Sequence, residues 1–304
     1  MRVLACTNCR YPNNYNNKIR KPAEQTFRGV TYTPPDKFSF SNFNPIILYM
    51  NKLFGKSLEL ARRRIHKVSE YLEPRLWEVP IGKTYAWDIN GEDRQKYVIV
   101  LHGTGQNITN LQHLYEAILQ NTSYAVLAPE FQGFGKNQSA KIGPKTFLED
   151  SVAAFEYLNS QGIPARNITI LGHSLGGFAA AQLAEKYPNA ERLIMVSSID
   201  KLSESLNSQG TIKKRFPPFI AFLFKTFSFL KSPLDNLFRT HDCLKKLEMP
   251  VDIIHSKRDT LVSSTASESL AQYCKNLHSL KFLDDNYHGI DATKVSEIVS
   301  ILRG

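Results

Sequence analysis

The sequence predicts an α/β fold, with a mostly parallel sheet and helices on both of its faces. Short apolar runs rich in β-branched residues alternate with helical patterns from residue 76 to the C-terminus. The runs lie at 97–101, 124–128, 168–171, 193–196, 251–255 and 280–283, and the helical patterns lie near 110–120, 146–160, 175–187, 265–275 and 291–302. Because parallel strands are usually joined by a crossover helix, repeated β–α units predict a parallel sheet that is covered on both sides.

Two segments depart from this alternation, and they predict how the chain is divided. Residues 76–304 form the expected α/β domain, interrupted at about 200–248 by an insertion in which residues 216–229 hold six of the 18 phenylalanines. An insertion at the carboxyl ends of such strands commonly covers a site. We therefore expect a small, Phe-rich helical cap. Its candidate residues for binding an apolar substrate are Phe219, Phe222 and Phe227. Residues 1–75 are expected to form a basic N-terminal arm and an amphipathic helix.

The amphipathic helix is expected over residues 46–72. Asn44 and Pro45 are typical of a helix start, and apolar side chains follow at spacings of three and four. The cations on another face are Lys52, Lys56, Arg63 and Lys67. Of the net charge of +10, most is concentrated in residues 1–74, which carry 13 Lys and Arg against 5 Asp and Glu. Two interpretations follow: a helix that packs on the α/β domain, or one that docks on an anionic membrane surface.

Composition excludes several classes of protein. With 42% hydrophobic and 22% charged residues, the chain is typical of a globular protein rather than a disordered one. Four cysteines are too few for a disulfide framework, and the Cys6–Cys9 pair lacks a second pair at zinc-site spacing. The first residues lack the apolar run of a signal peptide, and the apolar stretch at 216–230 is too short to span a membrane. We expect a cytoplasmic protein, peripheral at a membrane if the basic helix docks there, with no metal, other cofactor or nucleic-acid partner.

A nucleophile motif lies between a predicted strand and a predicted helix. Residues 172–176, GHSLG, fit the pattern GxSxG, after the run ITIL and before LGGFAAAQLAEKY. A strand-to-helix turn this sharp holds the serine backbone in a strained conformation, and small flanking residues let the neighbouring backbone approach. The hydroxyl group is then raised above the sheet at the positive end of a helix. Ser174 is therefore the predicted nucleophile, and the alternative is a structural serine in a tight turn.

A serine hydroxyl needs a base, and the base needs a carboxylate that orients it. His288 follows the last predicted strand, in a loop at the same edge of the sheet as Ser174. Asp259 follows the run VDIIH at that edge and lies between the two in the chain order Ser, Asp, His. We predict that Asp259 is the acid. Its rival is Asp200, just past the 193–196 run, and the alternative for His288 is an ordinary loop histidine.

Hydrogen-bond donors are also needed for the negative charge that develops on the substrate oxygen. The backbone N–H of Leu175, the residue after the nucleophile, is one candidate. The second is expected from the glycine-containing turn after the run YVIVL, with Thr104 as the donor. His102 and His173 adjoin these two turns, so we interpret them as stabilising the turns rather than as bases.

Five segments together resemble serine hydrolases of the α/β-hydrolase fold. They are LHGTGQN, PEFQGFGKN, GHSLGG, SPLDNLFRTHDCLKKLEMPVDIIHSKRDTLV and NYHG, and the resemblance covers roughly residues 76–304. The chain looks closest to the BEM-type subgroup, which includes acylglycerol and lysophospholipid lipases and protein depalmitoylases. The resemblance implies an eight-stranded, mostly parallel sheet and a Ser174–Asp259–His288 triad. The chain departs from the subgroup at residues 104–105, where Asn-Ala is usual, and at 130–132, where Asp-Tyr-Arg is usual.

These observations predict a serine hydrolase that cleaves an ester or thioester of a hydrophobic acyl chain through an acyl-enzyme. One alternative is a serine peptidase, because the same fold hosts prolyl-type peptidases. An alternative of another class is a catalytically inactive membrane-surface binding or scaffold protein, which would be expected to lack a member of the triad.

Overall fold

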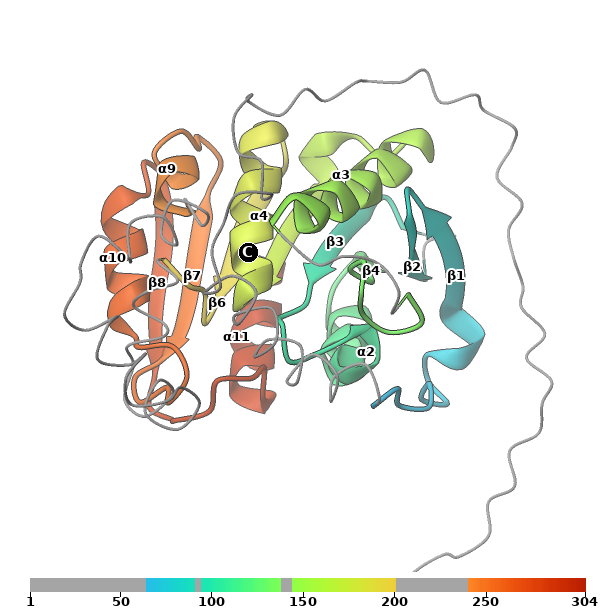
Figure 1. The fold of residues 1–304 in the computed structure, drawn as a ribbon, viewed down its shortest axis with the longest axis horizontal. Coiled ribbons are helices and arrows are strands. Elements are labelled where there is room, and N and C mark those ends of the chain that lie inside the picture. The colour runs from blue at the N-terminus through green and yellow to red at the C-terminus, as the bar shows by residue number, and fades with distance from the viewer. Residues whose placement is uncertain (1–63, 91–93, 138–143, 201–239) are drawn as a thin grey trace, which may run out of the picture.

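The computed structural model describes residues 64–90, 94–137, 144–200 and 240–304 (Figure 1). These residues form one eight-stranded sheet in the order β1-β2-β4-β3-β5-β6-β7-β8. The strands are β1 (Leu76–Ile81), β2 (Thr84–Ile89), β3 (Lys96–Leu101), β4 (Tyr124–Pro129), β5 (Ile168–His173), β6 (Arg192–Val196), β7 (Val251–Ser256) and β8 (Leu277–Leu283). The α-helices are α2 (Gln112–Asn121), α3 (Pro144–Ser160), α4 (Leu175–Lys186), α9 (Thr240–Leu244), α10 (Thr265–Tyr273) and α11 (Ala292–Arg303).

The sheet is mostly parallel, as the sequence predicts. Strands β3 to β8 all run parallel to one another, whereas β1 and β2 form an antiparallel hairpin and β2 pairs antiparallel with β4. The six apolar runs all coincide with strands. The hairpin is an addition that the alternation of β–α units does not reveal, and its turn is made at Gly82, which has a φ of 47°.

Helices cover both faces of the sheet, and the side chains of each strand alternate between them. In β3, Tyr97, Ile99 and Leu101 pack with α3, α4 and α10 on one face. Val98 and Val100 pack with α2 and α11 on the other. Burial on both faces explains why the central strands are continuously apolar. It also fixes their register, since a slip of one residue would exchange the two faces.

The predicted helix over 46–72 is wrong in the part that can be compared, residues 64–72, which form no helix. At two positions there the backbone donates to side chains of the α/β domain. His66 N donates to Thr109 Oγ1 at 3.0 Å, and Ser69 N donates to Gln112 Oε1 at 2.7 Å. Leu72 is fully buried in the core beside α2. Tertiary contacts therefore override the helical spacing, and this stretch packs on the domain.

Two other predictions fall largely outside the described residues. Residues 46–63 of the expected helix and most of the expected cap, including Phe219, Phe222 and Phe227, are not among them. Of the segment at 200–248, the structure describes residue 200 and residues 240–248, which include α9. Among the described helices, none has both the length and the apolar character needed to cross a bilayer.

Candidate active site

Ser174 occupies the sharp turn between β5 and α4. Its backbone has a φ of 54° and a ψ of −118°, a region that residues other than glycine rarely adopt. Glycines on either side permit the turn. A Cβ at Gly172 would collide with the backbone carbonyl group of Gly176, and a Cβ at Gly176 would collide with the carbonyl oxygen of Leu101 at the end of β3. The turn has the strained geometry that the GHSLG motif predicts.

Three predicted residues meet at the carboxyl edge of the sheet. His288 lies five residues after β8, and its Nε2 is 3.0 Å from Ser174 Oγ. On the other side of the ring, His288 Nδ1 is 2.7 Å from Asp259 Oδ2, in the loop after β7. Ser174 is 8% exposed and the Asp259 side chain is fully buried. The structure thus brings together a hydroxyl, an imidazole and a carboxylate in one hydrogen-bonded chain.

The surroundings of Asp259 keep its carboxylate ionised. Burial alone would raise the pKa of Asp259, but hydrogen bonds from histidines and from backbone N–H groups outweigh burial and hold the pKa below its usual range. Leu261 N and Val262 N donate to Oδ1 at 2.8 and 3.0 Å. Buried His255 approaches Oδ2 at 3.4 Å and is itself held by Ser267 and the carbonyl oxygen of Val262. An ionised carboxylate is the form that can orient His288 and stabilise it when it gains a proton.

Asp200, the rival acid, has other partners. Its Oδ2 accepts from Ser269 Oγ at 2.7 Å, and its Oδ1 lies 3.1 Å from His241 Nδ1. These contacts join the end of β6 to α9 and α10. Asp200 is fully buried but holds the two helices rather than His288, so the geometry favours Asp259 as the acid.

The two predicted oxyanion donors lie in turns that border Ser174. Leu175 is the first residue of α4, where a backbone N–H has no acceptor within the helix. Thr104 is half-buried in the turn after β3. A Cβ on its neighbour Gly103 would stand 3.2 Å from Ser174 Cβ and 3.0 Å from His173 Nδ1, so the turn lies directly against the nucleophile. Both N–H groups belong to backbone whose position is fixed by close packing.

His173 connects the oxyanion turn to the loop that carries His288. Its Nδ1 lies 2.8 Å from Gln106 Oε1, and its Nε2 lies 2.9 Å from the carbonyl oxygen of His288. Burial, reinforced by the charge of His288 when protonated, lowers the pKa of His173 to about 3, so this ring stays neutral. His173 therefore supports the turns, as its place in the sequence suggests.

Lys294 helps to position the loop that carries His288, and the sequence patterns did not predict this role. Although it is a lysine, it is fully buried in α11, and its Nζ donates to the carbonyl oxygen of Tyr287 at 2.7 Å. Ser256 Oγ donates to the same oxygen at 2.8 Å. The residue before His288 is thus fixed from two elements. The available signal was a lysine on the apolar stripe of the last helix, in line with the buried Ile298 and Leu302.

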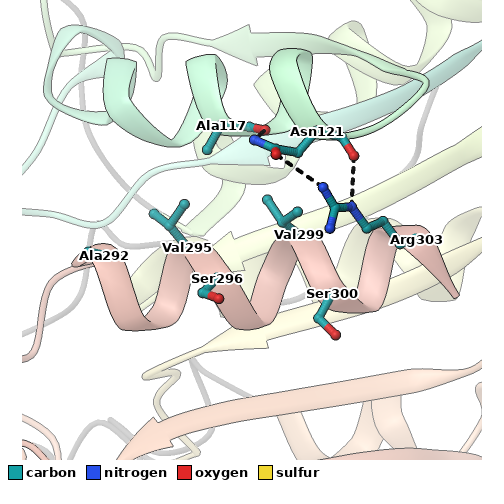
Figure 2. A pocket seen from close by; sticks show the side chains of 8 residues that line it. All are labelled: Ala117, Asn121, Ala292, Val295, Ser296, Val299, Ser300 and Arg303. Atoms are coloured by element: carbon teal, nitrogen blue, oxygen red, sulfur yellow. Dashed lines mark hydrogen bonds between the residues drawn. The ribbon is translucent and has the colours of Figure 1, made fainter.

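A hollow lies away from these residues. This cavity of about 440 Å³ lies between α2 and α11 and is lined by Val295, Val299 and the Arg303–Asn121 pair, among others (Figure 2). Arg303 closes one end by donating to the backbone and side-chain oxygens of Asn121 at 2.9 and 3.0 Å. None of the three triad residues lines this cavity. Within the described residues, no group of three or more His, Cys, Asp or Glu side chains is arranged to hold a metal ion.

The fold and this edge of the sheet define an α/β hydrolase of the serine-hydrolase type. Residues 92–248, just over half of the chain, match the model of the serine aminopeptidase S33 family, and the chain belongs to that family. The α/β-hydrolase resemblance is confirmed, and the BEM-type subgroup stays a prediction.

Two individual relatives match shorter segments of the chain than the family model does. An uncharacterised protein of Mycobacterium tuberculosis is 32% identical over 107 residues, which are 33% of this chain and 28% of that protein. A proline iminopeptidase of Pestalotiopsis fici is 35% identical over 108 residues, 35% of this chain and 37% of the relative. The matched segments thus span only about a third of these relatives. The structure is also similar to that of an esterase of Pyrococcus furiosus, with a TM-score of 0.62 and 19% identity over 79% of this chain and 95% of the other.

Proposed function

We propose that this hydrolase cleaves carboxylic esters or thioesters of hydrophobic acyl chains through a covalent acyl-serine. The observation that carries the proposal is the hydrogen-bonded chain from Ser174 through His288 to Asp259, with a strained serine backbone at its start. Esterases are among the solved structures of the same fold, which supports this class of substrate by analogy.

The reaction divides into two acyl transfers. His288 Nε2 takes the proton of Ser174 as Oγ attacks the carbonyl carbon, and the oxygen of the tetrahedral intermediate is stabilised by the N–H groups of Thr104 and Leu175. His288 then gives the proton to the departing alcohol or thiol. In the second half, water loses a proton to His288 and attacks the acyl-serine. The carboxylic acid leaves and the proton returns to Ser174 Oγ.

The test combines active-site labelling with a substrate series. The wild type should react with a fluorophosphonate and hydrolyse p-nitrophenyl and thioester acyl substrates, whereas Ser174→Ala should do neither. The substitution removes one buried oxygen and leaves no large cavity, so the variant should remain folded by circular dichroism. Undiminished labelling of the alanine variant would show that Ser174 is not the nucleophile.

Acyl-chain length tests the substrate class. Each buried methylene group is worth roughly 0.8 kcal/mol. If the Phe-rich segment at 200–248 supplies an apolar wall, kcat/KM should rise several-fold for each two carbons until the site is full. A flat or falling series from acetyl to octanoyl would instead indicate that these rings serve packing.

A peptidase is the second candidate, favoured by the family match and by the proline iminopeptidase relative. The same triad can cleave an amide when a second group recognises a free amino terminus. Aminoacyl and prolyl naphthylamides assayed beside the esters separate the two candidates. Turnover of the amides with kcat/KM above that of every ester would establish the peptidase and overturn the esterase proposal.

A further inference from the structure

The cavity between α2 and α11 forms where small side chains face each other. Ala117 projects from α2 and Ala292 from the start of α11, and neither fills the space between the two helices (Figure 2). The larger Leu114 and Ile118 of α2 are fully buried and pack with the sheet instead. At about 440 Å³, the cavity lies within the range of small-molecule sites, about 300–1,000 Å³.

The floor of the cavity is apolar. Val295 and Val299 rise from α11 toward α2 (Figure 2). Val299 is 8% exposed, and Val295 packs against the core cluster on this face of the sheet. Ser296 and Ser300 also line the cavity, so its wall combines apolar side chains with hydroxyl groups. A ligand that fits this lining has an apolar chain and a polar end.

One end of the cavity carries a guanidinium group. Arg303 Nε donates to the backbone oxygen of Asn121 at 2.9 Å, and Nη2 donates to its side-chain oxygen at 3.0 Å. These contacts use one side of a group that has five N–H donors. Among the described residues, Arg303 Nη1 has no hydrogen-bond or ion-pair partner. The end of the guanidinium fork, formed by Nη1 and Nη2, is therefore available to a ligand.

A second arginine lies at the same end of α2. Arg94 Nη2 donates to the carbonyl oxygen of Leu119 at 2.9 Å, and Nη1 donates to those of Thr122 and Tyr124. The last carbonyl groups of a helix carry partial negative charge, and the two arginines offset that charge here. Within the part of the chain that the structure describes, no carboxylate pairs with either of them. This end of the cavity is therefore complementary to an anion.

We propose that this cavity binds a medium-chain carboxylate, with the chain along Val295 and Val299 and the carboxylate on the Arg303 guanidinium group. The planar fork of a guanidinium group matches the two oxygens of a carboxylate. A carboxylic acid with a hydrophobic chain is also what the proposed reaction releases, and for this source of the ligand the inference rests on the proposed function. The cavity is then a product-binding site separate from the triad.

The test is a titration of the full-length protein with sodium octanoate, followed by the valine methyl signals in ¹³C–¹H spectra. The signals of Val295 and Val299, assigned from their Val→Ile variants, should shift and saturate. Hexanoate should bind several-fold more weakly, because each buried methylene group contributes. Uncharged 1-octanol should bind about three- to tenfold more weakly than octanoate, since it cannot pair with the guanidinium group. In Arg303→Gln, octanoate binding should weaken by the same factor and octanol binding should not change.

Arg75→Gln is the matched control, because Arg75 also donates to a carbonyl oxygen, that of Tyr71 at 2.7 Å, and does not line the cavity. It should bind octanoate as the wild type does. Ala117→Phe should block the cavity and abolish the shifts. Octanoate that binds Arg303→Gln or Ala117→Phe as tightly as the wild type, or that leaves both valine signals unshifted, overturns the proposal.

The titration needs no turnover, so the two proposals fail separately. A wild type that hydrolyses no ester but binds octanoate in this cavity refutes the esterase and retains the site. An active esterase whose cavity binds no octanoate overturns the site alone.

Discussion

Replacing Lys294 by methionine should loosen the loop that carries His288. Methionine has a similar length and no charge, so it fills the same buried volume but cannot donate to the Tyr287 carbonyl oxygen. The structure also places Lys294 Nζ 3.5 Å from Asp285 Oδ1 and 3.8 Å from Asp291 Oδ1. These carboxylates are about a quarter exposed, so water can solvate them once the cation is gone.

The magnitude follows from the contact that is lost. A hydrogen bond from a charged donor contributes about 1.5–3 kcal/mol, and Ser256 Oγ still satisfies the Tyr287 oxygen. We expect the free energy of unfolding to fall by about 2–3 kcal/mol. If the lost contact makes the aligned arrangement of His288 about 1.4 kcal/mol less favourable, kcat should drop about tenfold.

The assay is urea unfolding at neutral pH together with steady-state kinetics. Lys281→Met is the control, because the contact of Lys281 with Glu297 at 3.1 Å is half-exposed, and such pairs are worth about 0–1 kcal/mol. A Lys294→Met variant with unchanged stability would refute the contact's contribution. A destabilised variant with unchanged kcat would show that Lys294 anchors α11 but does not align His288.

Three further predictions concern other groups. Asp259→Asn should lower kcat by about 10⁴, the cost of losing the imidazole orientation, whereas Asp200→Asn should lower stability with little effect on kcat; the reverse pattern would move the acid to the end of β6. Burial raises the pKa of Asp150 to about 6, so the native state binds this proton more tightly than the unfolded state, and urea-unfolding stability should decline as pH rises from about 4 to 6. A decline that persists in Asp150→Asn would contradict this assignment. We also propose that the full chain binds phosphatidylserine vesicles at low salt and more weakly at high salt. Binding should also weaken when Lys52, Lys56, Arg63 and Lys67 are all replaced by glutamine. Unchanged binding of that variant would exclude this docking surface.

The parallel core of the fold was predictable because burial on both faces leaves continuous apolar runs in the sequence. The hairpin of β1 and β2 escaped prediction for the opposite reason. It lies at the edge of the sheet and mixes polar and apolar residues, with Glu78 and Pro80 in β1 and Asp88 in β2. Pro80 is tolerated there because an edge strand does not use every backbone N–H. Its pattern therefore resembles a loop until its pairing partner is known.

The error in residues 64–72 has a different origin. Ile65, Val68 and Leu72 continue the spacing of a helix, but Ile65 is 51% exposed while Leu72 is buried. Apolar spacing reports which residues could share a helical face, whereas tertiary hydrogen bonds decide whether a helix forms. The side chains of Thr109 and Gln112 that capture this backbone lie more than 40 positions along the chain. No local pattern contains that information.

The candidate site divides in the same way. The positions of Ser174, Asp259 and His288 could be predicted because each follows a strand end, and the sheet brings those ends to one edge. The contribution of Lys294 could not be predicted in this way, because it depends on the Tyr287 carbonyl oxygen and on Asp285, which the folded loop brings to its Nζ. Buried charges of this kind are stable only when paired, and the pairing is a property of the assembled edge.

The contact between Asp259 and His288 meets one physical requirement. An imidazole has two nitrogens, and a carboxylate on one of them determines which way the ring faces and where its proton lies. His288 Nδ1 lies against Asp259 and Nε2 faces Ser174. On our proposed function, Nε2 is therefore the nitrogen that is free to take the proton of the Ser174 hydroxyl group as its oxygen attacks the substrate.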